Sequence, residues 1–461
     1  MAPGLPRWRK LGYGVADFGA SLSYNAINFF LLFFLVNILE LRPALAGSVL
    51  LLGRTIDAIT DPLMGLITDR TRSRWGRRMP YIWFGLLPLA ASFALLWMIP
   101  AGTQAAMFIV AALALSLHTI LFTVVQVPYL SLTPDLAPSY GDRTSLTSYR
   151  IGFGTLASLV AAAAPPLIVA AADPATELSQ TSPEGWMMMG AAFAAAIAIA
   201  YTLMALLVRE PKLERPERRP LALFGELKTA LRIYGFLPLV LLFMVITLGL
   251  GVISSMLPFY LDSNLRLGAE LQTVTLGLLF VTAILSLPLW NVLAGRTDKR
   301  SALAVGLVVL ALALLLLVGL APPGMSAYLL AMSTIAGVGV GAILLFPWAM
   351  LPDVVEFDEL ATGHRREGLV YAIFTFGQKV AFALGVFVNG QVQERTGYEP
   401  GALAQSDAAI AGIAFMVGPA AAVIFLVALL FLWRFPVSRA RHEAAMRELK
   451  ARAGAMQEGS R

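Results

Sequence analysis

The sequence predicts an all-α membrane protein of twelve transmembrane helices, arranged as two six-helix halves. Three observations predict this fold class: 58% of the 461 residues are hydrophobic and 13% are charged, apolar runs of about 20 residues recur along the chain, and one polar stretch divides these runs into two equal sets. The mean hydropathy of +0.76 is far above that of ordinary soluble proteins. Lipid must therefore surround most of the chain.

Six of the expected spans precede residue 209 when the chain is read in windows of about 19 residues. They cover residues 13–37, 45–67, 81–99, 106–131, 147–172 and 187–208. The first run is too long for the apolar part of a signal peptide, so we expect it to remain as the first helix. Residues 1–208 are thus predicted to form the N-terminal six-helix bundle.

The charged and proline-containing segment REPKLERPERRP, residues 209–220, follows these spans. It predicts a cytoplasmic linker over 209–236, a C-terminal six-helix bundle over 237–435 and a basic cytoplasmic tail over 436–461. The six further spans cover residues 237–261, 270–294, 302–320, 326–350, 369–391 and 408–433.

A short internal repeat supports the division into halves. The basic turn TDRTRSRWGRR, residues 68–78, follows the second span, and AGRTDKRSA, residues 294–302, follows the second span of the other half. Matching loops after matching helices are typical of transporters built from repeats, with the substrate site between the halves near the bilayer midplane.

The distribution of lysine and arginine predicts the orientation. On the expected topology, 28 of the 34 lie on the side of the two termini and three, Arg42, Arg266 and Arg395, lie on the other side. Positively charged loops face the cytoplasm, so both termini are predicted to be cytoplasmic in a plasma (inner) membrane.

Composition and missing motifs exclude several functional classes. The chain has no cysteine and only three scattered histidines, which excludes disulfides, thiolate chemistry and a histidine-rich metal site. It also lacks a nucleotide-binding loop, an HExxH motif and a nucleophile with its base. We therefore expect no enzyme activity, no cofactor and no nucleic-acid partner. The expected partners of a monomer are membrane lipid, a small solute and a coupling cation.

The second span contains ionisable side chains that an apolar helix does not keep without a reason, since each costs at least about 2.5 kcal/mol at mid-span. Arg54, Asp57 and Asp61 stand at i, i+3 and i+7, on one face of a helix. Two carboxylates one turn apart repel each other unless a cation joins them. With the hydroxyls of Thr60 or Thr123 as further oxygen ligands, they predict a site for Na⁺ or H⁺.

Two further cations lie within predicted spans. Lys379 belongs to the eleventh span, and Arg150 lies near the start of the fifth. We interpret Arg54 and Lys379 as a charge network that responds to the bound cation. The alternatives are a purely structural network that neutralises the aspartates, and an Arg150 side chain that extends to the near membrane interface.

Polar and aromatic side chains of several spans are candidates for a substrate site. For Asp17 a helix cap or an interfacial position is the alternative, and aromatic side chains more often pack in the core or face lipid. His118 is predicted to be a buried, hydrogen-bonded histidine rather than a proton relay. The candidates from these spans are Asp17, Asn25, Gln126, Tyr129, Arg150, Trp348 and Lys379.

Nearly end to end, the chain resembles the glycoside, pentoside and hexuronide cation symporter family of the major facilitator superfamily, which includes the melibiose permease. The resemblance is carried by Lys379 and by three long segments: RTIDAITDPLMGLITDRTRSRWGRRMPYI (54–82), VPYLSLTPDLAPSYGDRTSLTSYR (127–150) and MLPDVVEFDELATGHRREG (350–368). It implies the major facilitator fold and alternating access. It also implies that Asp57 and Asp61 hold the cation beside Thr123, that Arg150 lies in the sugar pocket, and that Lys379 links both sites.

The chain departs from the family pattern at Ser21 and Gln126, where the melibiose permease carries sugar-binding aspartates. By this correspondence Ser21 is, like Gln126, a candidate for the substrate site. Charge-assisted hydrogen bonds contribute about 1.5–3 kcal/mol each, so a galactoside would lose several kcal/mol here. The QVPY segment, residues 126–129, is similar to one in the animal lysophosphatidylcholine symporter. The resemblance therefore implies a cation-coupled symporter of a sugar or glycoside, with a lysophospholipid or another amphipath as the alternative substrate.

Overall fold

The computed structural model describes residues 5–137, 140–172, 182–211, 233–320, 326–362, 367–402, 404–437 and 441–448. The first described helices are α1 (Arg7–Ala26), α2 (Pro43–Arg70), α3 (Met79–Leu95), α4 (Gln104–Leu136), α5 (Tyr140–Ala172) and α6 (Pro183–Leu207). Two π-helical turns, η1 (Ile27–Leu31) and η2 (Phe34–Ile38), continue α1. Predicted spans one to six each overlap one of these helices; span one also covers η1 and most of η2, and span three runs to residue 99 whereas α3 ends at Leu95.

The second set of helices follows after residue 233. It comprises α8 (Phe236–Phe259) with the π turn η3 (Tyr260–Asn264), α9 (Ala269–Arg296), α10 (Lys299–Gly319), α11 (Ser326–Thr362), α12 (Glu367–Arg395), and α13 (Asp407–Phe415), which continues through η4 (Met416–Ala420) into α14 (Ala421–Arg434). A last helix, after α14, covers residues 441–448.

Nine helices of the described chain are long and apolar enough to cross a membrane. They cover the fourth to twelfth predicted spans except for Val208 and Leu320, so the chain is an all-helical, multi-pass membrane protein. Of the first three predicted spans, α3 is apolar but has only 17 residues, and α2 is less apolar because it carries Arg54, Asp57 and Asp61. The number of twelve spans stays a prediction.

The chain contacts divide the helices into two compact units. Unit 1 comprises Met1–Glu217, Ser254–Gly277 and Val386–Ala414, and unit 2 comprises Arg218–Ile253, Leu278–Gly385 and Phe415–Arg461. The predicted six-helix halves remain a prediction. Most of the predicted linker, residues 212–232, and the end of the basic tail, residues 449–461, lie outside the described residues.

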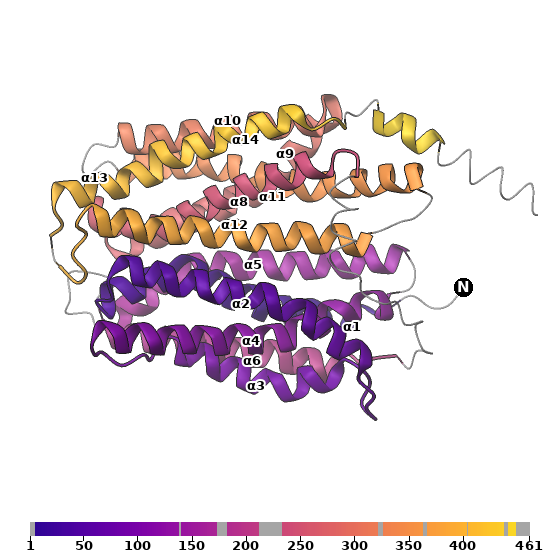
Figure 1. The fold of residues 1–461 in the computed structure, drawn as a ribbon, viewed down its shortest axis with the longest axis horizontal. Helices are drawn as coiled ribbons and strands as arrows, with labels where there is room; N and C mark the ends of the chain where they lie inside the picture. The colour runs from indigo at the N-terminus through magenta and orange to yellow at the C-terminus, as the bar shows by residue number, and fades with distance from the viewer. Residues whose placement is uncertain are drawn as a thin grey trace, which may run out of the picture. The chain divides into compact units, whose positions relative to one another are not determined.

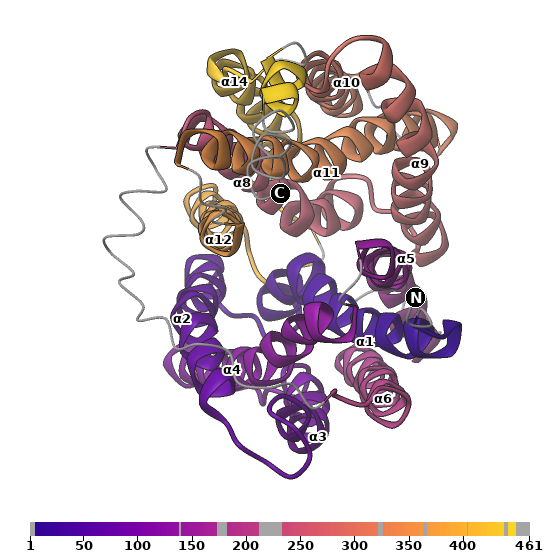
Figure 2. The same ribbon diagram turned by 90° about the vertical axis from the view of Figure 1, so that its right-hand side faces the viewer.

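Within unit 1 the first six helices run side by side (Figure 1). Viewed along the helices, α1 lies against α5 and α6, and α4 lies against α2 and α3 (Figure 2). The wide turns of η1 and η2 bury a run of aromatic side chains, and Phe34 packs on Trp97 while Trp97 stacks on Trp186 with ring centroids 5.4 Å apart. This packing fixes the position of α1, which carries several of the predicted site residues.

The two basic turns of the repeat each contact an aspartate on a helix of their own unit. After α2, the guanidinium group of Arg78 pairs with Asp135 of α4. After α9, the ammonium group of Lys299 pairs with Asp353 of α11, 2.7 Å away. Each aspartate directly follows a proline in the sequence. Both copies of the repeated basic turn therefore have the same structural role: a cationic side chain of the turn forms an ion pair with an aspartate of another helix.

Candidate functional site

The two aspartates of α2 face a threonine of α4. Thr123 Oγ1 lies 3.3 Å from Asp57 Oδ1 and 2.9 Å from Asp61 Oδ1, and it is also 3.3 Å from Thr60 Oγ1. Asp57 is only 2% exposed and Thr123 only 1%. The structure thus brings all four predicted cation ligands together, on the face where α2 packs against α4.

The hydroxyl groups of this cluster show which oxygen atoms share a proton. A hydroxyl group has one proton, so Thr123 can donate to only one of the two carboxylates at a time. Thr60 donates its own proton to the carbonyl oxygen of Ile56, 2.9 Å away, and so offers Thr123 a lone pair. The single hydroxyl proton of Thr123 therefore cannot serve both carboxylates at once. A proton on one carboxyl group, or a Na⁺ ion among the oxygens, would balance the pair of carboxylates.

Arg54 forms one edge of this cluster. Its Nη1 lies 3.7 Å from Asp57 Oδ2, its guanidinium carbon lies 4.3 Å from the centroid of the Tyr24 ring, and another of its nitrogens donates to Asn28. Asn28 was not among the sequence candidates, although an asparagine in an apolar run, three residues after Asn25, is a signal that could have found it. Arg54 thus keeps α1 and α2 in contact at the carboxylates.

A small cavity of about 30 Å³ lies beside Asp57. Its walls include Tyr24, Arg54 and His118. Both ring nitrogens of His118 lie 3.0 Å from a serine hydroxyl, one from Ser23 and one from Ser92. His118 therefore is the buried, hydrogen-bonded histidine that the sequence predicted, since it is 3% exposed and each ring nitrogen has a serine partner.

A second polar cluster lies between α1 and α5. Asp17 Oδ1 is 4.0 Å from Nε of Arg150, and the amide nitrogen of Asn25 donates to the hydroxyl of Ser158, 3.0 Å away. Gly154 permits this approach of the helices, because a Cβ atom at its position would lie 2.5 Å from Asp17 Oδ2 and 3.0 Å from the hydroxyl of Ser21. Four of the predicted substrate residues therefore meet here, together with Ser158, which the sequence analysis missed.

Gln126 and Tyr129 belong to a third, more enclosed group. The hydroxyl of Tyr201 donates to Oε1 of Gln126, 2.8 Å away. Tyr129 is fully buried, its ring stacks on Tyr13 with centroids 4.6 Å apart, and its hydroxyl donates to the Tyr13 carbonyl oxygen at 2.9 Å. Tyr129 thus packs α4 against α1, and its role beside the substrate stays a prediction.

Two of the predicted substrate residues lie in unit 2. Trp348 of α11 is 37% exposed and packs edge-on against Phe243 and Phe374, with ring centroids 5.5 and 5.3 Å away. Lys379 is half-buried on α12. Their roles beside the substrate and the cation stay predictions, because the clusters around Asp57 and Asp17 belong to unit 1.

The sequence matches the protein family described as "MFS/sugar transport protein" over residues 12–439. It is 32% identical to an uncharacterized symporter of Synechocystis, and the alignment covers 96% of each chain. It is 26% identical to sodium-dependent lysophosphatidylcholine symporter 1-A of Danio rerio, over 96% of this chain and 88% of that protein. The isoprimeverose transporter of Lactiplantibacillus pentosus is 25% identical over 86% of this chain and 81% of its own length.

The fold is similar to those of solved transporters. The bacterial homologue of the human lysosomal transporter Spinster, in its inward-facing and occupied conformation, superposes with a TM-score of 0.66 at 15% sequence identity. The superposition covers 95% of this chain and 99% of the other. At this identity the likeness concerns the fold.

Proposed function

The chain belongs to the MFS/sugar transport protein family of the major facilitator superfamily, and from this premise we propose that it is a cation-coupled symporter that moves a small solute by alternating access. The observation that carries the proposal is the contact of one hydroxyl, Thr123 Oγ1, with the two carboxylates of Asp57 and Asp61. The family and the relatives named above are transporters, so the chain is a membrane transport protein and not an enzyme.

Coupling follows from the chemistry of this cluster. A cation held by Asp57, Asp61, Thr60 and Thr123 removes the repulsion between the carboxylates and changes the electrostatic environment of Arg54, which contacts both α1 and α2. A cation that binds one conformation more tightly shifts the equilibrium toward that conformation. The movement of α1, which carries Asp17, Ser21 and Asn25, would then change solute affinity.

The solute that we place first is a sugar or glycoside. Asp17 offers acceptors, Arg150 offers donors, and Asn25 with Ser158 offers both, which suits the mixed donors and acceptors of sugar hydroxyls. The family description and the isoprimeverose transporter among the relatives support this class. Ser21 and Gln126 would add neutral hydrogen bonds, so we expect weaker binding than two further carboxylates would give.

A lysophospholipid is the second candidate. The carboxylate of Asp17 and the guanidinium group of Arg150, 4.0 Å apart, match the opposite charges of a zwitterionic headgroup. A guanidinium group binds phosphate in a bidentate manner, and a carboxylate pairs with a quaternary ammonium group. The likeness to the lysophosphatidylcholine symporter of Danio rerio supports this alternative.

Several finer features belong to the same proposal. We assign the chain to the glycoside, pentoside and hexuronide symporter group, as a monomer without an organic cofactor, in a plasma (inner) membrane with both termini in the cytoplasm. Its working parts would be the two six-helix halves. Gln126, Tyr129, Trp348 and Lys379 would complete the solute site, with Lys379 as the link between solute and cation.

A sodium titration of thermal stability tests the cation site. We would measure the unfolding temperature of the purified protein across a Na⁺ titration at fixed ionic strength and at two pH values, for the native chain, for Asp61→Asn and for the control Asp407→Asn. A ligand present at 100 times its Kd stabilises the folded state by about 2.7 kcal/mol. Asp407 is exposed at the start of α13, so its substitution removes the same charge outside the cluster.

The expected result is a saturable Na⁺ shift in the native chain and in Asp407→Asn that is lost in Asp61→Asn. A pH-dependent shift with the same pattern, and no Na⁺ shift, would identify H⁺ as the coupling cation. If Asp61→Asn responds to both ions as the native chain does, the carboxylates are a structural network and the proposed cation site is wrong.

Binding of labelled solutes separates the two substrate classes. We would compare a panel of sugars and glycosides with lysophosphatidylcholine, for the native chain and for Arg150→Gln. The leading proposal requires saturable sugar binding that Arg150→Gln weakens. Saturable lysophosphatidylcholine binding without sugar binding would replace it with the second candidate.

A further inference from the structure

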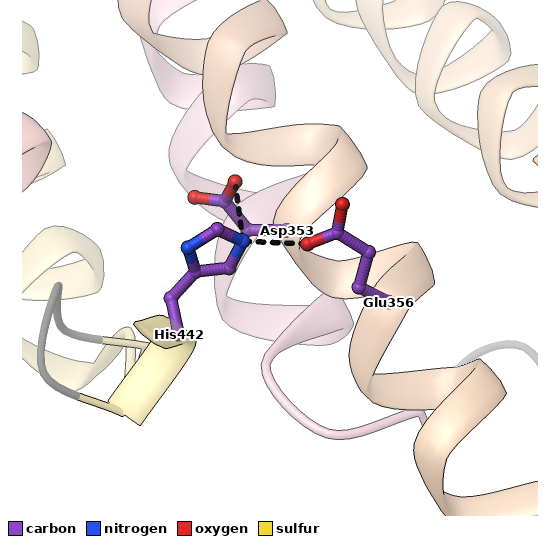
Figure 3. A group of neighbouring side chains, drawn as sticks. All are labelled: Asp353, Glu356 and His442. Carbon is purple, nitrogen blue, oxygen red and sulfur yellow. Dashed lines mark hydrogen bonds and ion pairs between the residues drawn. The ribbon is translucent and has the colours of Figure 1, made fainter. Parts of the chain in front are cut away.

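Three side chains with metal-binding atoms meet where the helix of residues 441–448 lies against α11. Asp353 and Glu356 lie one turn apart on α11, and His442 points toward both from the other helix (Figure 3). His442 Nε2 is 2.5 Å from Glu356 Oε2 and 3.6 Å from Asp353 Oδ1. All three residues belong to unit 2.

The spacing of these atoms is close to that of a metal site. The three ligand atoms lie within 4.8 Å of one another. Around a metal ion with bonds of about 2.0–2.2 Å, neighbouring ligand atoms are about 3.0–3.5 Å apart. Small side-chain rotations would therefore give Asp353, Glu356 and His442 this spacing without movement of either helix.

The types of ligand indicate which metal would bind. One imidazole with two carboxylates suits Zn²⁺ and its neighbours such as Co²⁺, whereas Mg²⁺ and Ca²⁺ prefer oxygen ligands alone. A cavity of about 320 Å³ adjoins the cluster, with Asp353 and His442 in its wall. The cavity has room for the water molecules that complete the coordination of a three-ligand site.

The charges around the cluster leave it a net attraction for a cation. Lys299 holds Asp353 through both carboxylate oxygens, at 2.7 and 2.8 Å. Arg300 directs one nitrogen to the carbonyl oxygen of Trp433, 3.1 Å away. The described cavity wall carries the anions Asp298, Asp353 and Glu443 and the cations Lys299 and Arg300. Glu356 adds a fourth anion beside the wall, so negative charges outnumber positive ones.

The hydrogen bonds from Lys299 leave the carboxylate of Asp353 with lone pairs that could bind a metal. An ionised carboxylate has about four lone-pair sites, so it can accept from an ammonium group and coordinate a metal at the same time. Lys299 also donates to the carbonyl oxygen of Ala349, which fixes its position. In a metal site it would act as the partner that orients Asp353, the role that hydrogen-bond donors behind a ligand usually have.

We propose that Asp353, Glu356 and His442 form a binding site for a transition-metal dication of the Zn²⁺ class, and that the bound metal attaches the helix of residues 441–448 to α11. This inference is independent of the proposed symport, because none of its residues belongs to the cation or solute clusters described above.

A titration with Co²⁺, whose visible absorbance reports its ligands, tests the site directly. The full chain would be purified, its affinity tag removed, and Co²⁺ binding followed for the native protein, His442→Ala, Glu356→Gln and the control His364→Ala. The control removes another histidine and leaves the three proposed ligands in place. Size-exclusion chromatography and metal-free unfolding temperatures would confirm that each variant is folded.

We expect saturable Co²⁺ binding with one equivalent per chain, displaced by Zn²⁺, in the native protein and in His364→Ala. His442→Ala and Glu356→Gln should each raise the Kd at least about tenfold, because each removes one of three protein ligands. Zn²⁺ should also slow tryptic cleavage at Arg447 in the native chain and not in His442→Ala.

The proposal is overturned if the native chain shows no saturable Co²⁺ binding, or if His442→Ala and Glu356→Gln bind Co²⁺ as tightly as the native chain. The first result would leave the three residues as an ion-paired contact between two helices. The second would place the metal at other residues.

Discussion

Thr123 of α4 lies beside the two carboxylates of α2, Asp57 and Asp61. Its hydroxyl lies within 3.3 Å of both of them, yet it has a single proton to share. In the proposed cation site, an oxygen atom from the neighbouring helix α4 would therefore act as a ligand in addition to the two carboxylates of α2.

We predict that Thr123→Val weakens cation binding at least about tenfold, because valine has a similar shape and no oxygen ligand; this corresponds to about 1.4 kcal/mol. Thr123→Ser keeps the oxygen and should retain affinity within about threefold, or 0.7 kcal/mol. The measurement is the Na⁺ dependence of thermal unfolding. Equal affinity in Thr123→Val and the native chain would show that Thr123 is not a ligand.

Gly154 offers a second test at the scale of single residues. In Gly154→Ala the new methyl group would meet the side-chain oxygens of Asp17 and Ser21. Because these atoms end flexible side chains, we expect Asp17 to turn aside and solute affinity to fall, with a stability loss below about 2 kcal/mol. Gly152→Ala is the matched control, since nothing lies within 4 Å of its Cβ. Unchanged solute binding in Gly154→Ala would argue against a role for Asp17.

Helices α8 and α12 pack with their backbones in close contact. A Cβ atom at Gly251 of α8 would collide with the carbonyl oxygen of Phe382 on α12, and one at Gly385 of α12 would collide with that of Leu248. Apolar attraction does not draw helices together in lipid, so small residues that allow van der Waals contact are what hold such a pair.

We predict that Gly251→Ala destabilises the protein by about 1–3 kcal/mol, because a rigid backbone atom cannot move aside and the two helices must separate. Gly65→Ala, at a mid-helix position of α2 with nothing within 4 Å, should be neutral or stabilising. Unfolding temperatures of the two purified variants give the comparison. Equal temperatures would mean that α8 and α12 can separate at no cost.

The side chain of Glu210 accepts hydrogen bonds from the first backbone N–H groups of α3. Its Oε2 accepts the backbone N–H groups of Arg78 and Met79, at 2.8 and 3.1 Å, at the start of α3. Glu210→Ala leaves these donors without their acceptor, so we expect the free energy of unfolding to fall by about 0.5–2 kcal/mol. Arg209→Ala, at an exposed neighbouring position, is the control. A Glu210→Ala protein as stable as the control would refute the capping role.

At the scale of the whole molecule, the proposed symport requires a cation gradient. A membrane potential of 100 mV contributes about 2.3 kcal/mol per charge, which can concentrate a neutral solute about fiftyfold. We predict accumulation in proteoliposomes under such a gradient and none after an ionophore collapses it. Asp57→Asn should abolish the accumulation as well. Accumulation that survives the ionophore would contradict cation coupling.

Much of the fold could be predicted from the sequence. The fourth to twelfth expected spans coincide with apolar helices because lipid requires long, internally hydrogen-bonded segments. The face shared by Arg54, Asp57 and Asp61 could also be predicted, since it depends only on the helical repeat. The end of α3 at Leu95 could not be predicted, because the apolar run continues past it. In the turn that follows, Trp97 packs on Phe34 and Trp186, which lie far away in the sequence.

By itself, the sequence determined that the chain is a membrane protein, where most of its helices lie, and which of them carry charge, because these properties depend on neighbours along the chain. Only the tertiary structure decided that Thr123 lies beside both carboxylates and that Asn28 accepts a hydrogen bond from Arg54. It also decided that Asp17 packs against Gly154 and that His442 lies beside Asp353. These contacts join residues on different helices. Their geometry depends on how the helices pack, which no pattern along a single helix specifies.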